Sequence, residues 1–262
     1  MAAPAAARGD GSLSVRYNRR RLRFFPLTAG PFVQPFRISV THLIAAAVCL
    51  LAGGVAFAHG ISGDDQAFLL RNAGPNIGPY IYLGAKHMVT GYDHLLFLAG
   101  VIFFLYRLRD VALYVTLFAV GHSVTLLLGV LGGLHVNAYL VDAVIGLSVV
   151  YKAFENLGGF EKLGFQPNMK AAVLFFGFFH GFGLATKLQD LAISENGLVT
   201  NMISFNVGVE IGQFLALAVI LIAFNAWRAT GRFMHYAFAT NVAIMCAGFM
   251  LMGYQLTGYA VA

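Results

Sequence analysis

The chain has 262 residues, of which 59% are hydrophobic and only 11% are charged. Soluble domains carry about 25% charged residues, so this chain has too little charge to cover a water-facing surface. The composition excludes an ordinary soluble globule, a disordered chain and a coiled coil. It predicts an all-α polytopic membrane helix bundle, because a helix satisfies its own backbone hydrogen bonds in lipid.

The net charge of +6 is concentrated near the N-terminus. Seven of the 17 basic residues lie in the first 37 positions, and the chain from His59 onward carries ten basic and ten acidic residues. A basic run before an apolar segment is typical of a topology signal, so no nucleic-acid partner is expected. The two cysteines, Cys49 and Cys246, lie in apolar runs, which argues against a structural disulfide and a thiolate metal cluster.

Residues 1–58 have the composition of a secretory signal peptide. Its three parts are a basic stretch at 16–24, an apolar run at 43–56 and the small-x-small sequence Ala56-Phe57-Ala58. The apolar run is shorter than the ~20 residues that span a bilayer. We therefore expect cleavage before His59, and an uncleaved additional N-terminal helix is the alternative.

A polar segment at 59–80, punctuated by glycine and proline, predicts a short periplasmic lead-in to one transmembrane domain at 81–258. This domain contains six apolar stretches, at about 81–106, 111–133, 138–157, 171–189, 199–227 and 235–258. Each is long enough to cross the ~30 Å hydrocarbon core as a helix. Three GxxxG spacings predict close helix packing, at Gly129/Gly133, Gly177/Gly181 and Gly208/Gly212.

The connections between the apolar stretches alternate in charge. Those on one side carry Arg107, Arg109, Lys162, Lys170, Arg228 and Arg232. Basic residues near the other side are diluted by aspartate and glutamate. The positive-inside rule places the first set in the cytoplasm. The mature N-terminus is then periplasmic, which agrees with the signal peptide and predicts a bacterial inner-membrane protein.

Ionisable residues recur inside the apolar stretches, where each costs a few kcal/mol and marks a pathway or site by default. They are Asp93, His94, His122, Glu155, His180 and Glu210, with His87 nearer the periplasmic end. Helical spacing aligns Ser148 and Tyr151 with Glu155, and Asn206 and Gln213 with Glu210. We expect these polar faces to point inward, so that five helices offer imidazole or carboxylate to a common centre.

Several histidines with carboxylates suit a divalent transition metal such as nickel, cobalt or zinc, and the lack of thiols argues against Cu(I) and iron–sulfur clusters. No organic cofactor is evident. A structural network of histidine–glutamate pairs is one alternative, and an intramembrane catalytic centre is another. His59 would follow the cleavage site, where its α-amine and imidazole form a candidate periplasmic capture point.

Five blocks resemble the second branch of the HupE/UreJ family of bacterial membrane proteins. They are HMVTGYDHLLFLAG (87–100), GHSVTLLLG (121–129), VDAVIGLSVVYKAFENL (141–157), FFGFFHGFGLATKL (175–188) and FNVGVEIGQ (205–213). The family is associated with hydrogenase and urease operons and is regarded as nickel or nickel/cobalt permeases. Gly121 replaces the usual alanine and Asp142 the usual glutamate, and this branch lacks the other branch's longer histidine-rich stretch, which bears on nickel specificity.

The resemblance implies metal-handling roles for His87, Asp93, His94, His122, Glu155, His180 and Glu210. The chain is thus predicted to be an inner-membrane permease for a divalent transition metal, with nickel favoured over cobalt. Two alternatives use the same residues: an intramembrane metal-dependent hydrolase acting on a lipid-like substrate, with Glu210 or Glu155 as general base, and a metal-insertion or assembly factor for a metalloenzyme complex. The expected partners are the bilayer and the metal ion, with metalloenzyme-maturation proteins and a second copy of the chain left open.

Overall fold

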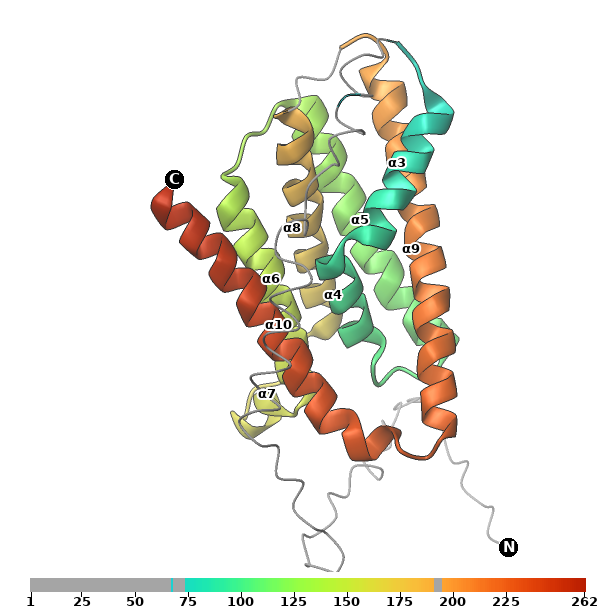
Figure 1. Cartoon of the computed structure of the whole chain (residues 1–262), viewed down its shortest axis with the longest axis vertical. Coiled ribbons are helices and arrows are strands. Elements are labelled where there is room, and N and C mark those ends of the chain that lie inside the picture. The colour runs from blue at the N-terminus through green and yellow to red at the C-terminus, as the bar shows by residue number, and fades with distance from the viewer. Residues whose placement is uncertain (1–66, 68–73, 191–194) are drawn as a thin grey trace, which may run out of the picture. The chain divides into compact units, whose positions relative to one another are not determined.

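The computed structural model describes residues 67, 74–190 and 195–262. The expected signal peptide and His59 lie outside these residues. Within them the chain is helical and contains no strand, which confirms the all-α class (Figure 1). The helices are α3 (Ile77–Thr90), α4 (Tyr92–Ile102), α5 (Leu108–Gly132), α6 (Ala138–Asn156), α7 (Gly159–Lys162), α8 (Met169–Gln189), α9 (Leu198–Ala229) and α10 (Phe233–Val261).

The first apolar stretch is broken into two helices. α3 ends at Thr90, α4 begins at Tyr92, and Gly91 between them has an extended backbone with φ −75° and ψ 101°. The expectation of one continuous helix over this stretch is therefore wrong. The Gly91 N–H still donates to the carbonyl oxygen of His87 at 3.0 Å, and its own carbonyl oxygen accepts from Leu95 N at 3.1 Å. Broken helices in membrane proteins commonly accompany binding sites.

Four helices, α5, α8, α9 and α10, are long and apolar enough to cross a membrane. α6 has 19 residues but carries Asp142, Lys152 and Glu155, and α4 is a shorter apolar helix. The helix bounds follow the predicted apolar stretches to within a few residues, apart from the break at Gly91. The chain is thus a membrane protein by length and composition of its helices, and the count of six spans stays a prediction.

Glycines bring three pairs of helices into close contact: α3 with α9, α5 with α8, and α6 with α10. They are Gly84, Gly208 and Gly212 in the first pair, Gly121, Gly177 and Gly181 in the second, and Gly146 and Gly248 in the third. A Cβ at any of them would lie closer than 3.0 Å to atoms of the partner helix. The spacings at Gly177/Gly181 and Gly208/Gly212 are thus confirmed as packing sites.

Gly129 also lies at a helix contact, where a Cβ would lie 2.5 Å from the Cβ of Ala185. Gly133 has a different role, because it ends α5 in the left-handed conformation with φ 63° and has no neighbour within 4 Å. A left-handed glycine is a common helix terminus. The third GxxxG spacing therefore contributes one packing glycine and one helix cap.

The α4–α5, α6–α8 and α9–α10 connections lie at one end of the helices, which we call the basic end (Figure 1). Arg228 at this end has a structural role beyond its charge. Its Nη2 donates to the carbonyl oxygens of Ile102 and Phe103, at 3.2 and 2.6 Å, and its guanidinium lies 4.3 Å from the ring centroid of Tyr106. A cation at a helix C-terminus is favourable, so Arg228 caps α4 and fixes the end of the broken span.

Candidate metal centre

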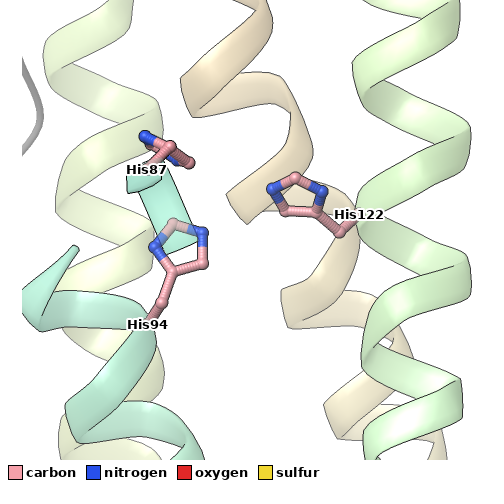
Figure 2. A group of neighbouring side chains, drawn as sticks. All are labelled: His87, His94 and His122. Carbon is pink, nitrogen blue, oxygen red and sulfur yellow. The ribbon is translucent and has the colours of Figure 1, made fainter. Parts of the chain in front are cut away.

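Four histidines from four helices meet inside the bundle. His94 on α4 is central: its ring centroid lies 5.2 Å from that of His87 on α3, 5.6 Å from that of His122 on α5 and 4.7 Å from that of His180 on α8. Figure 2 shows the rings of His87, His94 and His122 turned toward one another. α6 adds Ser148, whose Oγ lies 3.1 Å from Nε2 of His180. The structure thus brings together the four predicted histidine ligands and one supporting residue.

Two groups of three side chains have the geometry of metal ligands, and His94 belongs to both. The first consists of His87, His94 and His122, and the second of Asp93, His94 and His180. The candidate ligand atoms of each group lie within 4.8 Å of one another. Two nitrogens bound to one tetrahedral zinc ion lie roughly 3.3 Å apart, given bonds of about 2.0–2.1 Å. Small side-chain rotations would therefore close either group onto an ion.

His122 is only 1% exposed, and neither of its ring nitrogens has a hydrogen-bond partner among the described residues. A buried polar atom without a partner costs about 1–3 kcal/mol. A network of histidines that only held helices together would be expected to hydrogen-bond these nitrogens. A metal ion bound to one of them would remove part of this cost, so the environment of His122 favours a ligand over a structural role.

The break at Gly91 places Asp93 and His94. Asp93 lies in the first turn of α4, where the helix dipole stabilises a carboxylate, and its Oδ1 lies 3.0 Å from Nδ1 of His94. A Cβ on Gly91 would lie 3.0 Å from that nitrogen and 3.2 Å from Asp93 Oδ1. Glycine at this position thus leaves room for the aspartate–histidine pair.

The helix crossing of α5 and α8 places His122 and His180. Thr125 donates to the carbonyl oxygen of Phe178 across the two helices at 2.7 Å. A Cβ on Gly181 would overlap both Thr125 Oγ1 and the carbonyl oxygen of His122. The polar residue one turn from His122 therefore fixes the helix pair that carries two of the imidazoles.

A layer of buried phenylalanines lies next to the histidine cluster, on the side of the basic end. Phe97, Phe118 and Phe176 are at most 6% exposed, and each lies three or four residues from a cluster histidine on the side of the basic end. The ring centroid of Phe97 lies 5.4 Å from those of Phe118 and His180 and 6.0 Å from that of Phe176. This layer could not be predicted from the sequence, because phenylalanine is common on any apolar helix.

A second polar group lies nearer the basic end, centred on Lys152 of α6. Its Nζ pairs with the Glu155 carboxylate and donates to Asn156 Oδ1 at 2.7 Å. Asn156 Nδ2 in turn donates to the carbonyl oxygen of Gly100 on α4 and to Asn241 Oδ1 on α10, at 2.9 and 2.8 Å. Glu155 is thus neutralised by a lysine and belongs to neither group of metal ligands, and its role near an exit stays a prediction.

The polar residues of α9 do not converge as expected. Gln213 is buried and donates to the carbonyl oxygen of Val115 at 3.1 Å, Asn206 is half-buried, and Glu210 is exposed. The expected inward orientation of Glu210 is wrong, because α9 packs on α3 through Gly208 and Gly212. Glu210 is two residues from each of these glycines and so lies on the opposite side of the helix. Tyr151 on α6 packs its ring against aromatic neighbours and lies outside both ligand groups.

Lys152 is the charged residue that sequence reasoning missed. It is 9% exposed, and its position in an apolar stretch is itself the signal that could have found it. The structure shows what Asp142 contacts. Its Oδ2 accepts a hydrogen bond from Lys187 Nζ at 2.8 Å, which joins α6 to α8. Its role is that of an ion-paired helix contact.

Comparison with known proteins identifies one family. The sequence profile of a family described as HupE / UreJ protein matches residues 63–262. The matched region includes every described helix and both groups of candidate ligands. No curated protein and no solved structure gives a significant match. The match confirms the resemblance carried by the five sequence blocks.

Proposed function

The chain belongs to the HupE/UreJ family, and from this membership and the histidine cluster we propose that it is a permease for a divalent transition metal, with nickel favoured. The observation that carries the proposal is His122, buried beside His94 with neither nitrogen hydrogen-bonded within the described residues. Nitrogen and carboxylate donors suit nickel, cobalt and zinc. The binding residues in this proposal are His87, Asp93, His94, His122 and His180.

The proposed direction of transport follows from charge. The positive-inside rule would put the basic end in the cytoplasm of a bacterial inner membrane, so the ion enters from the periplasmic side, where His59 and His87 capture it. A doubly charged ion entering a negative interior gains about 4.6 kcal/mol per 100 mV, at 2.3 kcal/mol per elementary charge. The membrane potential is then sufficient to drive uptake.

Release toward the basic end requires two barriers to open. The ion must first pass the layer formed by Phe97, Phe118 and Phe176, and it then meets the Lys152–Glu155 pair. The lysine repels a divalent cation, whereas the glutamate attracts it. In this proposal the pair separates as the ion leaves, and Glu155 becomes its first partner beyond the phenylalanine layer.

The placement of the glutamates argues against a hydrolase in which Glu155 or Glu210 is the general base. A metal hydrolase needs a general base beside the metal-bound water. Glu155 pairs with Lys152 on the far side of the phenylalanine layer, and Glu210 is exposed on α9. Neither glutamate belongs to a candidate ligand group.

Uptake of radioactive nickel by whole cells tests the proposal. His94→Ala and His180→Ala are expected to abolish accumulation at matched membrane expression, because each removes a ligand and leaves a polar cavity that water can fill. Glu155→Gln is expected to slow uptake less. His235→Ala is the matched control, because that histidine is exposed at the start of α10. Unchanged uptake in both cluster variants, or a wild type that accumulates no nickel, cobalt or zinc, would exclude the permease function.

A further inference from the structure

Ser148 constrains which nitrogen of His180 carries a proton. A serine hydroxyl has one proton to donate, and Ser148 Oγ lies 2.6 Å from the carbonyl oxygen of Ile145, which can only accept. The hydroxyl proton is therefore committed to that carbonyl. Oγ also lies 3.1 Å from Nε2 of His180, so in this second contact Nε2 is the donor and Ser148 the acceptor.

The contact between Asp93 and His94 places the proton of the His94 ring on the other type of nitrogen, Nδ1. An ionised carboxylate only accepts hydrogen bonds, and Asp93 Oδ1 lies 3.0 Å from Nδ1 of His94. The proton of a neutral His94 ring is therefore on Nδ1. Figure 2 shows the other ring nitrogen of His94 on the side that faces His122.

A neutral imidazole carries one N–H and one lone pair, and a metal binds the lone pair. We propose that Ser148 and Asp93 hold the two central histidines in opposite tautomers, so that His180 binds the metal through Nδ1 and His94 through Nε2. This inference rests on the proposed metal site and assigns its ligand atoms. Ser148 acts through His180 and is a positioning residue that does not touch the metal.

The proposal explains why α6 contributes to the centre without a ligand of its own. Ser148 is fully buried, and its contact with His180 joins α6 to α8 at the level of the cluster. Groups that orient metal-bound histidines this way typically change metal affinity about 10–100-fold when they are removed. Ser148 on α6 thus sets the orientation of His180, which α8 provides.

Two measurements on the purified full-length protein test the inference. The first is ¹⁵N NMR of histidine-labelled protein, with His180 and His94 assigned by substitution. Without metal, we expect the proton on Nε2 of His180 and on Nδ1 of His94. When Zn²⁺ is added, the signals of His180 Nδ1 and His94 Nε2 should move. A proton on His180 Nδ1, or zinc bound through His180 Nε2, would overturn the assignment.

The second measurement is calorimetric titration with Ni²⁺. Ser148→Ala is expected to weaken binding about 10–100-fold, and Ser148→Thr, which keeps the hydroxyl, to restore most of it. Ser204→Ala is the control, because Ser204 is also a buried helical serine that donates to its own helix, at Thr200 O. Equal affinity of Ser148→Ala and wild type would refute the positioning role. A wild type that binds no metal would instead refute the proposed function, while the NMR signals would still decide the tautomers.

Discussion

At the scale of single residues, Gly91 lies beside the Asp93–His94 pair and carries no side chain. Its φ of −75° suits any amino acid, so backbone strain does not explain the glycine. The explanation is space, since a Cβ would lie 3.0 Å from Nδ1 of His94 and 3.2 Å from Oδ1 of Asp93. Gly91 therefore belongs to the site even though it has no side chain.

We predict that Gly91→Ala weakens nickel binding by about tenfold. Loss of a group that orients a metal ligand typically costs about 10–100-fold in affinity, and a displaced group should cost the lower value. The added methyl pushes the Asp93–His94 pair by a few tenths of an ångström while the helices stay intact. Gly78→Ala on α3 is the matched control, because no atom lies within 4 Å of its Cβ position. Calorimetric titration gives the affinity and circular dichroism the helix content. Equal affinity of the two variants would show that the pair tolerates the methyl group.

The sequence predicted the four histidines because ionisable side chains are costly in lipid and need a shared interior. It did not predict the environment of the carboxylates. Glu155 pairs with Lys152 one turn away, and Glu210 lies on the exposed face of α9. Whether a polar stripe faces the bundle depends on which neighbouring helix packs against it, and the helical period does not contain that information.

At the scale of helices, close helix contacts at glycines position the helices that carry the ligands. α3, which bears His87, packs on α9 at Gly84 and Gly208. Without a hydrophobic driving force between helices in lipid, such close contact is a main source of association. The separation of α3 and α9 therefore sets the position of one imidazole in the cluster.

Gly208→Val is expected to lower the thermal unfolding temperature in detergent, because its side chain would overlap the backbone of Ile81. Overpacking of this kind typically costs about 1–3 kcal/mol. Gly253→Val on α10 is the control, since its Cβ position has no neighbour within 4 Å. The same unfolding temperature in both variants would mean that the α3–α9 crossing relaxes without cost.

The helix bounds could be predicted from the sequence, because apolar runs bounded by charged connections show them directly. The break at Gly91 could not. His87, Thr90, Gly91 and His94 have the spacing of one continuous helical face, and a glycine inside an apolar run is often tolerated. The need for a glycine at this position appears only in the structure, where Asp93 and His94 occupy the space that a side chain would take.

At the scale of the whole molecule, composition predicts the membrane class and the family match confirms the lineage. His87 and His180 lie on helices far apart in the chain, and both contact His94 in a bundle in which α3 packs on α9 and α5 on α8. Helical periodicity cannot predict which helices pair. The alternation of basic and non-basic connections is consistent with the arrangement of the described helices, in which three connections meet at the basic end.

The most direct test of the central claim is crystallography of the purified, nickel-loaded protein, with data collected at the nickel absorption edge. We predict an anomalous peak inside the histidine cluster, within bonding distance of His94 and His180, and its loss in His94→Ala. A peak only at an exposed residue such as His135 or His235, or no peak at all, would contradict the assignment of this cluster as the metal site.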